Sequence, residues 1–138
     1  MPVTAQQTYD PVENILYVEH PGVTLETRDD IEGHFDRIVE YWQKTCNGRK
    51  AYYVVDYDGI TVNVKETDFY ALQIKRVATE CAVTVVRYGG DSLQRAASRL
   101  ANMKIHLPSQ LYASRAEALT VVRALQAGTM TVGAPRPQ

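Results

Sequence analysis

Apolar runs and amphipathic segments alternate along this chain, and the alternation predicts its elements. Residues 6–10 and 15–19 are expected to form two strands, because the turn over 10–14 between them contains proline and asparagine, which favour chain reversal. The runs 51–55 and 82–86 are mostly apolar and rich in β-branched and aromatic residues. Short runs of this kind are typical of strands that are covered on both faces.

Four other segments have apolar residues at helical spacing. In chain order they cover 28–46, about 65–80, a stretch that begins at 91 or 92, and 115–127. Their terminal signals are Thr27, Asn47-Gly48, Asp91 or Ser92, the capping-box sequence Ser114-Arg115-Ala116-Glu117, and Gly128. We expect each helix to bury one stripe of apolar residues. In chain order the four stripes are Ile31, Phe35, Ile38, Trp42 and Cys46; then Tyr70, Ile74, Val77 and Cys81; then Leu93, Ala96, Ala97, Leu100 and Met103; and last Leu119, Val122 and Leu125.

This order of elements, with a weaker strand near 110–112, predicts an α/β fold. Helices that alternate with strands after the hairpin imply a mixed, mostly parallel sheet of four to five strands with right-handed crossovers, about four helices and an N-terminal β-hairpin edge. The length of 138 residues suits one domain. We expect that domain to cover 8–127, preceded by a flexible N-terminus over 1–7 and followed by a mobile tail over 128–138.

Several segments resemble a known family. They are the hairpin that leads into His20-Pro21-Gly22, the helix capped by Thr27, the buried strand that ends in 54–60 with the pattern Asp-x-x-Gly-Ile, and the closing sequence 114–119. Together they resemble the STAS domain, the sulfate-transporter and anti-sigma-factor-antagonist fold, and in particular its divergent stand-alone SpoIIAA-like members. The resemblance covers 8–126. It implies a bacterial, cytoplasmic regulatory or scaffolding module without catalysis, which acts on a protein partner such as a regulator or a kinase-like protein.

In phosphorylated STAS domains a serine stands at the start of the second helix, just after the Asp-x-x-Gly turn. The matching positions here are Lys65 and Glu66, followed by Thr67, so the hydroxyl group is absent where the family has it. We therefore expect no phosphoserine switch at this place. Phosphate on Thr67 or Thr61 would overturn that expectation.

The charge pattern narrows the class of partner. The chain has a net charge of −1, which excludes binding of nucleic acid by bulk positive charge. Residues 1–69 carry a net charge of −7 and residues 70–138 one of +6. This asymmetry marks either an interaction surface, including a homodimer contact, or an acidic element that packs beside a basic one.

No pattern of histidine, cysteine or serine residues points to a cofactor, a metal or a catalytic group, and only the paired acids Asp56 and Asp58 offer ligands for Mg²⁺ or groups for acid–base chemistry. The three histidines are isolated in sequence, and Cys46 and Cys81 have no zinc-binding spacing, so both cysteines are expected in the core. The start of the chain lacks the apolar segment of a signal peptide, and no apolar run is long enough for a membrane span. We expect a cytoplasmic protein.

Two strand-to-helix turns are candidate sites. Asp56 and Asp58 follow a buried strand at the sheet edge where α/β proteins bind ligands, although such aspartates commonly just organise a turn. Gly89 and Gly90 precede a helix, where backbone N–H groups can hold an anion or merely be capped. The residues of a possible anion or ligand contact are Arg87, Gly89, Gly90, Ser92 and Arg95.

The first hypothesis is a non-enzymatic STAS-like module that works by protein–protein contact. Its expected interaction surface consists of Asp56, Asp58, Gly59, Ile60, Thr61, Lys65, Glu66, Thr67 and Asp68. The alternative is a binding module for a small apolar or lipid-like ligand between the sheet and its helices. Tyr52, Tyr53, Tyr57 and Tyr70 either fill the core or line such a pocket.

Overall fold

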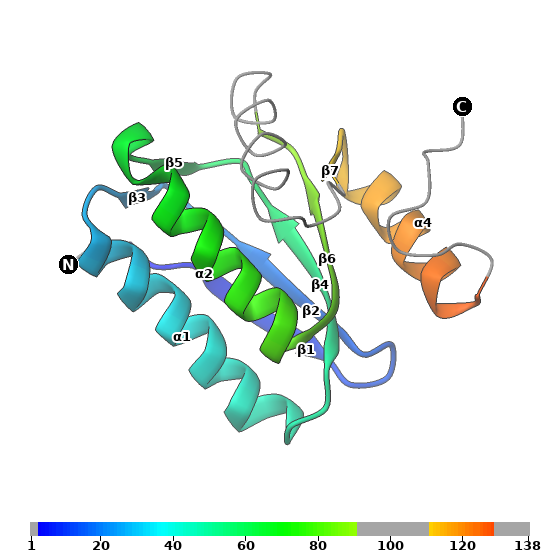
Figure 1. Cartoon of the computed structure of the whole chain (residues 1–138). Helices are drawn as coiled ribbons and strands as arrows, with labels where there is room; N and C mark the ends of the chain where they lie inside the picture. The colour runs from blue at the N-terminus through cyan, green and yellow to red at the C-terminus, as the bar shows by residue number, and fades with distance from the viewer. Residues whose placement is uncertain (1–2, 91–110, 129–138) are drawn as a thin grey trace.

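A central five-stranded sheet organises the chain, in the order β1-β2-β4-β6-β7 (Figure 1). The computed structural model describes residues 3–90 and 111–128. The strands are β1 (Gln6–Asp10), β2 (Ile15–Glu19), β3 (Val23–Leu25), β4 (Ala51–Asp56), β5 (Ile60–Val62), β6 (Ala82–Tyr88) and β7 (Leu111–Tyr112). The helices are α1 (Arg28–Cys46), the 3-10 turn η1 (Val64–Glu66), α2 (Thr67–Glu80) and α4 (Arg115–Gln126).

The predicted fold class is confirmed. β1 pairs with β2 antiparallel, whereas β2, β4, β6 and β7 run parallel. The hairpin turn forms for the expected reason: the Asp10 carboxylate accepts the backbone N–H groups of Val12 and Glu13 at 2.9 and 3.2 Å. Asn14 adopts a left-handed conformation with φ 58° and accepts the Tyr9 hydroxyl at 2.7 Å.

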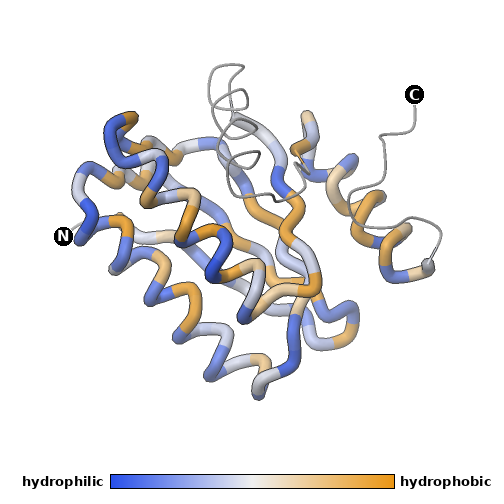
Figure 2. Tube along the Cα trace, viewed as in Figure 1, coloured by the Kyte–Doolittle hydropathy of each residue, from blue (hydrophilic) through white to orange (hydrophobic). Residues whose placement is uncertain are grey.

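Two apolar clusters lie on opposite faces of the sheet. α1 and α2 run side by side over one face, and α4 lies on the other (Figure 1). Tyr53 belongs to the first cluster and Val54 to the second, because successive strand residues point to opposite faces. Figure 2 shows the apolar positions recurring along the helices and concentrated in the central strands. α4 differs slightly from expectation, since Ala118 and Val121 are buried while Leu119 is half-buried.

α1 begins and ends where the sequence predicts. The Thr27 hydroxyl accepts the Asp30 N–H at 3.1 Å, and the Asp30 carboxylate accepts the Thr27 N–H at 3.1 Å. Asn47, the C-cap, has φ 51°. This reciprocal capping satisfies two N–H groups that the helix itself leaves unpaired.

A second, two-stranded parallel sheet was not expected. β3 pairs with β5, with Val23 opposite Ile60. Each strand has three residues and a threonine at its centre, too short for a recognisable alternation. This β3–β5 ribbon joins the loop after β2 to the loop after β4, and it therefore fixes the carboxyl-end edge of the main sheet.

Some expected boundaries lie elsewhere or outside the described residues. β1 begins at Gln6, two residues before the domain start expected at residue 8, and the weak strand near 110–112 is present as β7. The third helix, with Leu93, Ala96, Ala97, Leu100 and Met103, lies outside the described residues. So does most of the expected tail.

Candidate functional site

Asp56 and Asp58 organise the turn that follows β4. The Asp56 carboxylate accepts the backbone N–H of Asp58 at 2.7 Å. Partial burial raises the pKa of Asp56, although the Asp58 N–H opposes the shift. Of the two interpretations open from the sequence, the geometry supports a turn-forming role for Asp56.

Asp58 reaches across to the other candidate turn. Its carboxylate accepts the Gly90 N–H at 2.9 Å, and a Cβ on Gly89 would lie 2.8 Å from a carboxylate oxygen. The loops after β4 and β6 are thus joined by one side chain. A carboxylate of the protein itself occupies the position at Gly89-Gly90 where an external anion was considered. Ser92 and Arg95 lie outside the described residues.

Gly59 is required where two loops cross. Its φ is +81°, and a Cβ there would lie 2.2 Å from the His20 carbonyl oxygen. The Gly59 carbonyl accepts the Val23 N–H at 2.7 Å, which starts the β3–β5 ribbon. Ile60 follows and is buried, so it supports this edge from inside and adds nothing to an exposed surface.

The expected interaction surface continues along one exposed stripe. Lys65, Asp68, Leu72 and Lys75 are all exposed, and their spacing of three, four and three residues places them on the outer side of η1 and α2. We call these four residues the α2 stripe. Val64, at its N-terminal end, is 85% exposed, and Leu72 is 56% exposed.

Three other residues of the predicted surface differ in their contacts and exposure. Glu66 accepts the Arg28 Nε–H at 2.9 Å, which ties η1 to the start of α1. The Thr67 hydroxyl donates to the Val64 carbonyl at 2.7 Å. Thr61, in contrast, is exposed on β5.

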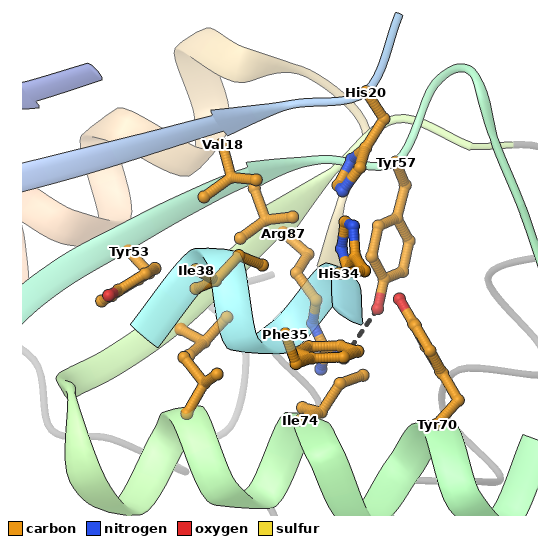
Figure 3. Close-up of a pocket in the computed structure, with 13 residues that line it drawn as sticks. Val18, His20, His34, Phe35, Ile38, Tyr53, Tyr57, Tyr70, Ile74 and Arg87 are labelled. Atoms are coloured by element: carbon orange, nitrogen blue, oxygen red, sulfur yellow. Dashed lines mark hydrogen bonds between the residues drawn. The ribbon is translucent and has the colours of Figure 1, made fainter. Parts of the chain in front are cut away.

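A small, mostly apolar cavity lies between the sheet, α1 and α2, where the sequence left a pocket open as an alternative; the polar groups gathered at one end of it were not predicted. Figure 3 shows His20, His34, Tyr57, Tyr70 and Arg87 gathered at one end, with Tyr53 at the other. Arg87 is 3% exposed and donates from Nη1 to the Tyr57 hydroxyl at 3.1 Å. Its guanidinium carbon lies 5.6 Å from the centre of the Tyr57 ring, in cation–π range.

The two histidines of this cavity pack against each other, with ring centres 5.4 Å apart. His20 Nδ1 contacts the Asp56 carbonyl oxygen, which can only accept, so Nδ1 carries the proton. Burial lowers the pKa of His34 to about 3, with the proximity of His20 and Arg37 acting in the same direction. Burial also lowers the pKa of His20. Both rings are therefore neutral at pH 7.

The cavity is small, about 40 Å³. A buried water occupies roughly 10–15 Å³ on this measure, so about three waters would fill it. Pockets for drug-sized ligands measure about 300–1,000 Å³. The expected lipid-like ligand would require a several-fold larger space between the sheet and the helices.

The sequence contained a partial signal for this cavity. His34 stands within the apolar stripe of α1, between Ile31 and Phe35, and Arg87 follows Val85 on the same strand face. A histidine or arginine at such positions must be buried. The distance in sequence between β2, α1, β4 and β6 concealed that they would meet.

Comparison with known proteins gives one informative result. No family model matches the sequence, and no curated protein matches it. Among solved structures, the chain is similar to the one titled "The overall structure of SLC26A9", with a TM-score of 0.57 and 10% identity over 94% of this chain. The chain has a STAS-like fold.

The resemblance to STAS domains drawn from the sequence is thus confirmed for the fold. At 10% identity, the likeness shows nothing beyond the fold. This STAS-like chain corresponds to 25% of the length of that solved chain. Within the described residues, no helix is long and apolar enough to cross a membrane, and no three His, Cys, Asp or Glu side chains are grouped to hold a metal ion.

Proposed function

We propose that this STAS-like chain is a non-enzymatic regulatory or scaffolding module that binds a protein partner through the α2 stripe and the adjoining turn 56–61. The observation that supports it is the exposure of two aliphatic side chains beside the charged residues of the α2 stripe: Leu72 within the stripe and Val64 at its N-terminal end. Exposed apolar patches with a polar rim mark protein contacts, and Val64 and Leu72 would supply the apolar part of such a patch.

The contact works without a phosphoserine switch. Lys65 and Glu66 stand where the family has the serine, and Glu66 pairs with Arg28. The Thr67 hydroxyl bonds the backbone of η1, so a phosphate there would displace that bond. Incubation with ATP and candidate kinases, followed by mass spectrometry, tests this: phosphate on Thr67 or Thr61 would contradict it.

The partner surface is tested by a double variant, Val64→Asp with Leu72→Asp. Both side chains are exposed, so the fold should be unaffected while the apolar part of the surface is lost. We expect the variant to lose partners that wild type captures in a pull-down. Val12→Asp is the matched control, since Val12 is 92% exposed in the β1–β2 turn. Equal capture by all three proteins would show that the partner binds elsewhere.

A further inference from the structure

His20 and His34 form a buried pair where the loops after β2 and β4 meet. The two residues are 5% and 2% exposed, and their ring centres are 5.4 Å apart. Figure 3 shows both rings at the polar end of the cavity, beside Tyr57. The pair therefore lies at the carboxyl-end edge of the main sheet, close to the β3–β5 ribbon.

His20 joins the loop after β2 to the end of β4. Its Nδ1 donates to the Asp56 carbonyl oxygen, and its own carbonyl accepts the Gly22 N–H at 2.9 Å. The Val23 N–H, next along the chain, donates to the Gly59 carbonyl at 2.7 Å and starts the ribbon. The His20 ring is thus packed at the base of the ribbon, and separation of the two loops would give this ring access to water.

His34 completes the pair from α1. Among the described residues, its ring packs against His20 and, edge to face, against Phe35 with ring centres 5.0 Å apart, and it makes no hydrogen bond. A proton added to either ring would place a charge in mostly apolar surroundings, which disfavour the charged form. A charge on His20 also disfavours one on His34. The closed fold therefore favours two neutral rings.

Other charged or titratable groups face the pair from each neighbouring element. They are Arg37 on α1, Asp56 and Tyr57 at the end of β4, Tyr70 on α2 and Arg87 on β6. The arginines keep their charge at every accessible pH, and burial holds the pKa of Tyr70 well above 10. The Asp56 carboxylate attracts a charge on His20, but burial has the larger effect and lowers the His20 pKa. Glu19, next to His20, pairs with Arg115 of α4 at 3.5 Å.

We propose that His20 and His34 form an acid-sensitive latch, in which protonation of the pair opens the β3–β5 ribbon while the main sheet stays folded. On opening, His20 leaves the cavity, His34 loses the ring that covers it, and both take up protons from water. The ribbon separates first because its strands have only three residues each. The latch is independent of the proposed partner contact.

Amide hydrogen–deuterium exchange at pH 7.5 and 5.5 tests the latch. Each rate is divided by that of an unstructured peptide at the same pH, because intrinsic exchange varies with pH. The Val23 and Asn63 amides, bonded to Gly59 and Leu25, report on the ribbon, and the Ala51 amide, bonded to Cys81, reports on the main sheet. We expect less protection of the ribbon than of Ala51 at both pH values. Ribbon protection should fall at pH 5.5 by up to about tenfold for each histidine, given an open-state pKa of about 6.5.

Two variants assign the fall to the pair. His20→Asn keeps a side-chain N–H donor for the Asp56 carbonyl but takes up no proton in this range, so the fall should be smaller. It should be absent when His34→Gln is added. Asn63→Ala is the matched control, because it removes the bonds to the Glu26 carbonyl and the Lys65 N–H without changing a titratable group. Its Val23 amide should be less protected at both pH values, with the wild-type ratio between them.

Wild-type protein alone can overturn the proposal, so the test does not depend on the folding of any variant. Ribbon protection that is unchanged between pH 7.5 and 5.5 would show that the pair does not control the ribbon. Protection equal to that of Ala51 at both pH values would show that the ribbon opens only with the main sheet. An undiminished fall in a folded double variant would assign the effect to other groups and overturn the latch as well.

Discussion

At the scale of single residues, two aspartates hold the turn that follows β4. Asp56 accepts the Asp58 N–H within the turn, whereas Asp58 accepts the Gly90 N–H of the loop after β6; from the sequence, a turn-organising role and a ligand-binding role were both open for these two residues. The sequence did not predict that His20, His34 and Arg87 would meet in the interior. Their contacts depend on the packing of α1 and the crossing of strands, which local sequence does not encode.

Gly59→Ala is expected to destabilise the protein strongly. A left-handed backbone costs a non-glycine residue about 1–2 kcal/mol. The Cβ would also collide with the His20 carbonyl at 2.2 Å, so the total loss should exceed about 2 kcal/mol. Gly22→Ala is the control, since its φ is +80° but no atom lies within 4 Å of its Cβ. Urea unfolding of both variants measures the difference, and equal losses would show that the collision is relieved.

Stability is expected to fall as the pH drops from 7 to 5.5. The folded pKa of His34 is about 3 and that of His20 is also lowered, so the unfolded chain binds more protons over this range. Each such histidine lowers the free energy of unfolding by up to about 1.4 kcal/mol per pH unit below its unfolded pKa of about 6.5. The raised pKa of Asp56 acts in the opposite direction.

Urea titrations of wild type and His34→Gln at pH 7 and 5.5 measure this dependence. The variant should show a smaller loss of stability between the two pH values than wild type. The charge of Arg37 also lowers the pKa of His34, so it contributes to the same dependence. A pH dependence that is equal in both proteins would assign the effect to other groups.

At the scale of elements, long periodic segments were predictable and short paired ones were not. α1 was located by its cap and by apolar residues over several turns, and the hairpin by its turn. The β3–β5 ribbon has three residues on each side and depends on a contact between distant loops. No pattern in the sequence of Val23–Leu25 distinguishes this strand from an irregular loop.

Thr27→Ala should weaken the start of α1 by about 1 kcal/mol, because the Asp30 N–H loses its acceptor. Thr27→Ser retains the oxygen and serves as control. The free energy of unfolding from urea titration measures both, and an unchanged value for Thr27→Ala would mean that water replaces the cap without cost.

At the scale of the whole molecule, the two sheet faces are closed by different parts of the chain. α1 and α2 come from residues 28–80 and α4 from residues 115–126. The apolar runs 51–55 and 82–86 predicted this two-sided burial correctly. The small size of the cavity was beyond prediction, since it depends on how closely helices approach the sheet.

β1 forms one edge of the main sheet, and we predict a homodimer through this edge or through the charge asymmetry between the two halves of the chain. Light scattering in 50 mM and 500 mM salt distinguishes the two routes, since salt screens an electrostatic contact. A monomer under all conditions would contradict both routes.

The β3–β5 ribbon has a consequence for the order in which the chain opens. Three-residue strands held by contacts between distant loops have little stability of their own, so the ribbon should separate before the main sheet does. The amides of Val23 and Asn63, bonded to Gly59 and Leu25, should exchange with deuterium faster than that of Ala51, bonded to Cys81. Local unfolding would then release η1 and the adjoining α2 stripe first, and a binding partner would slow that exchange.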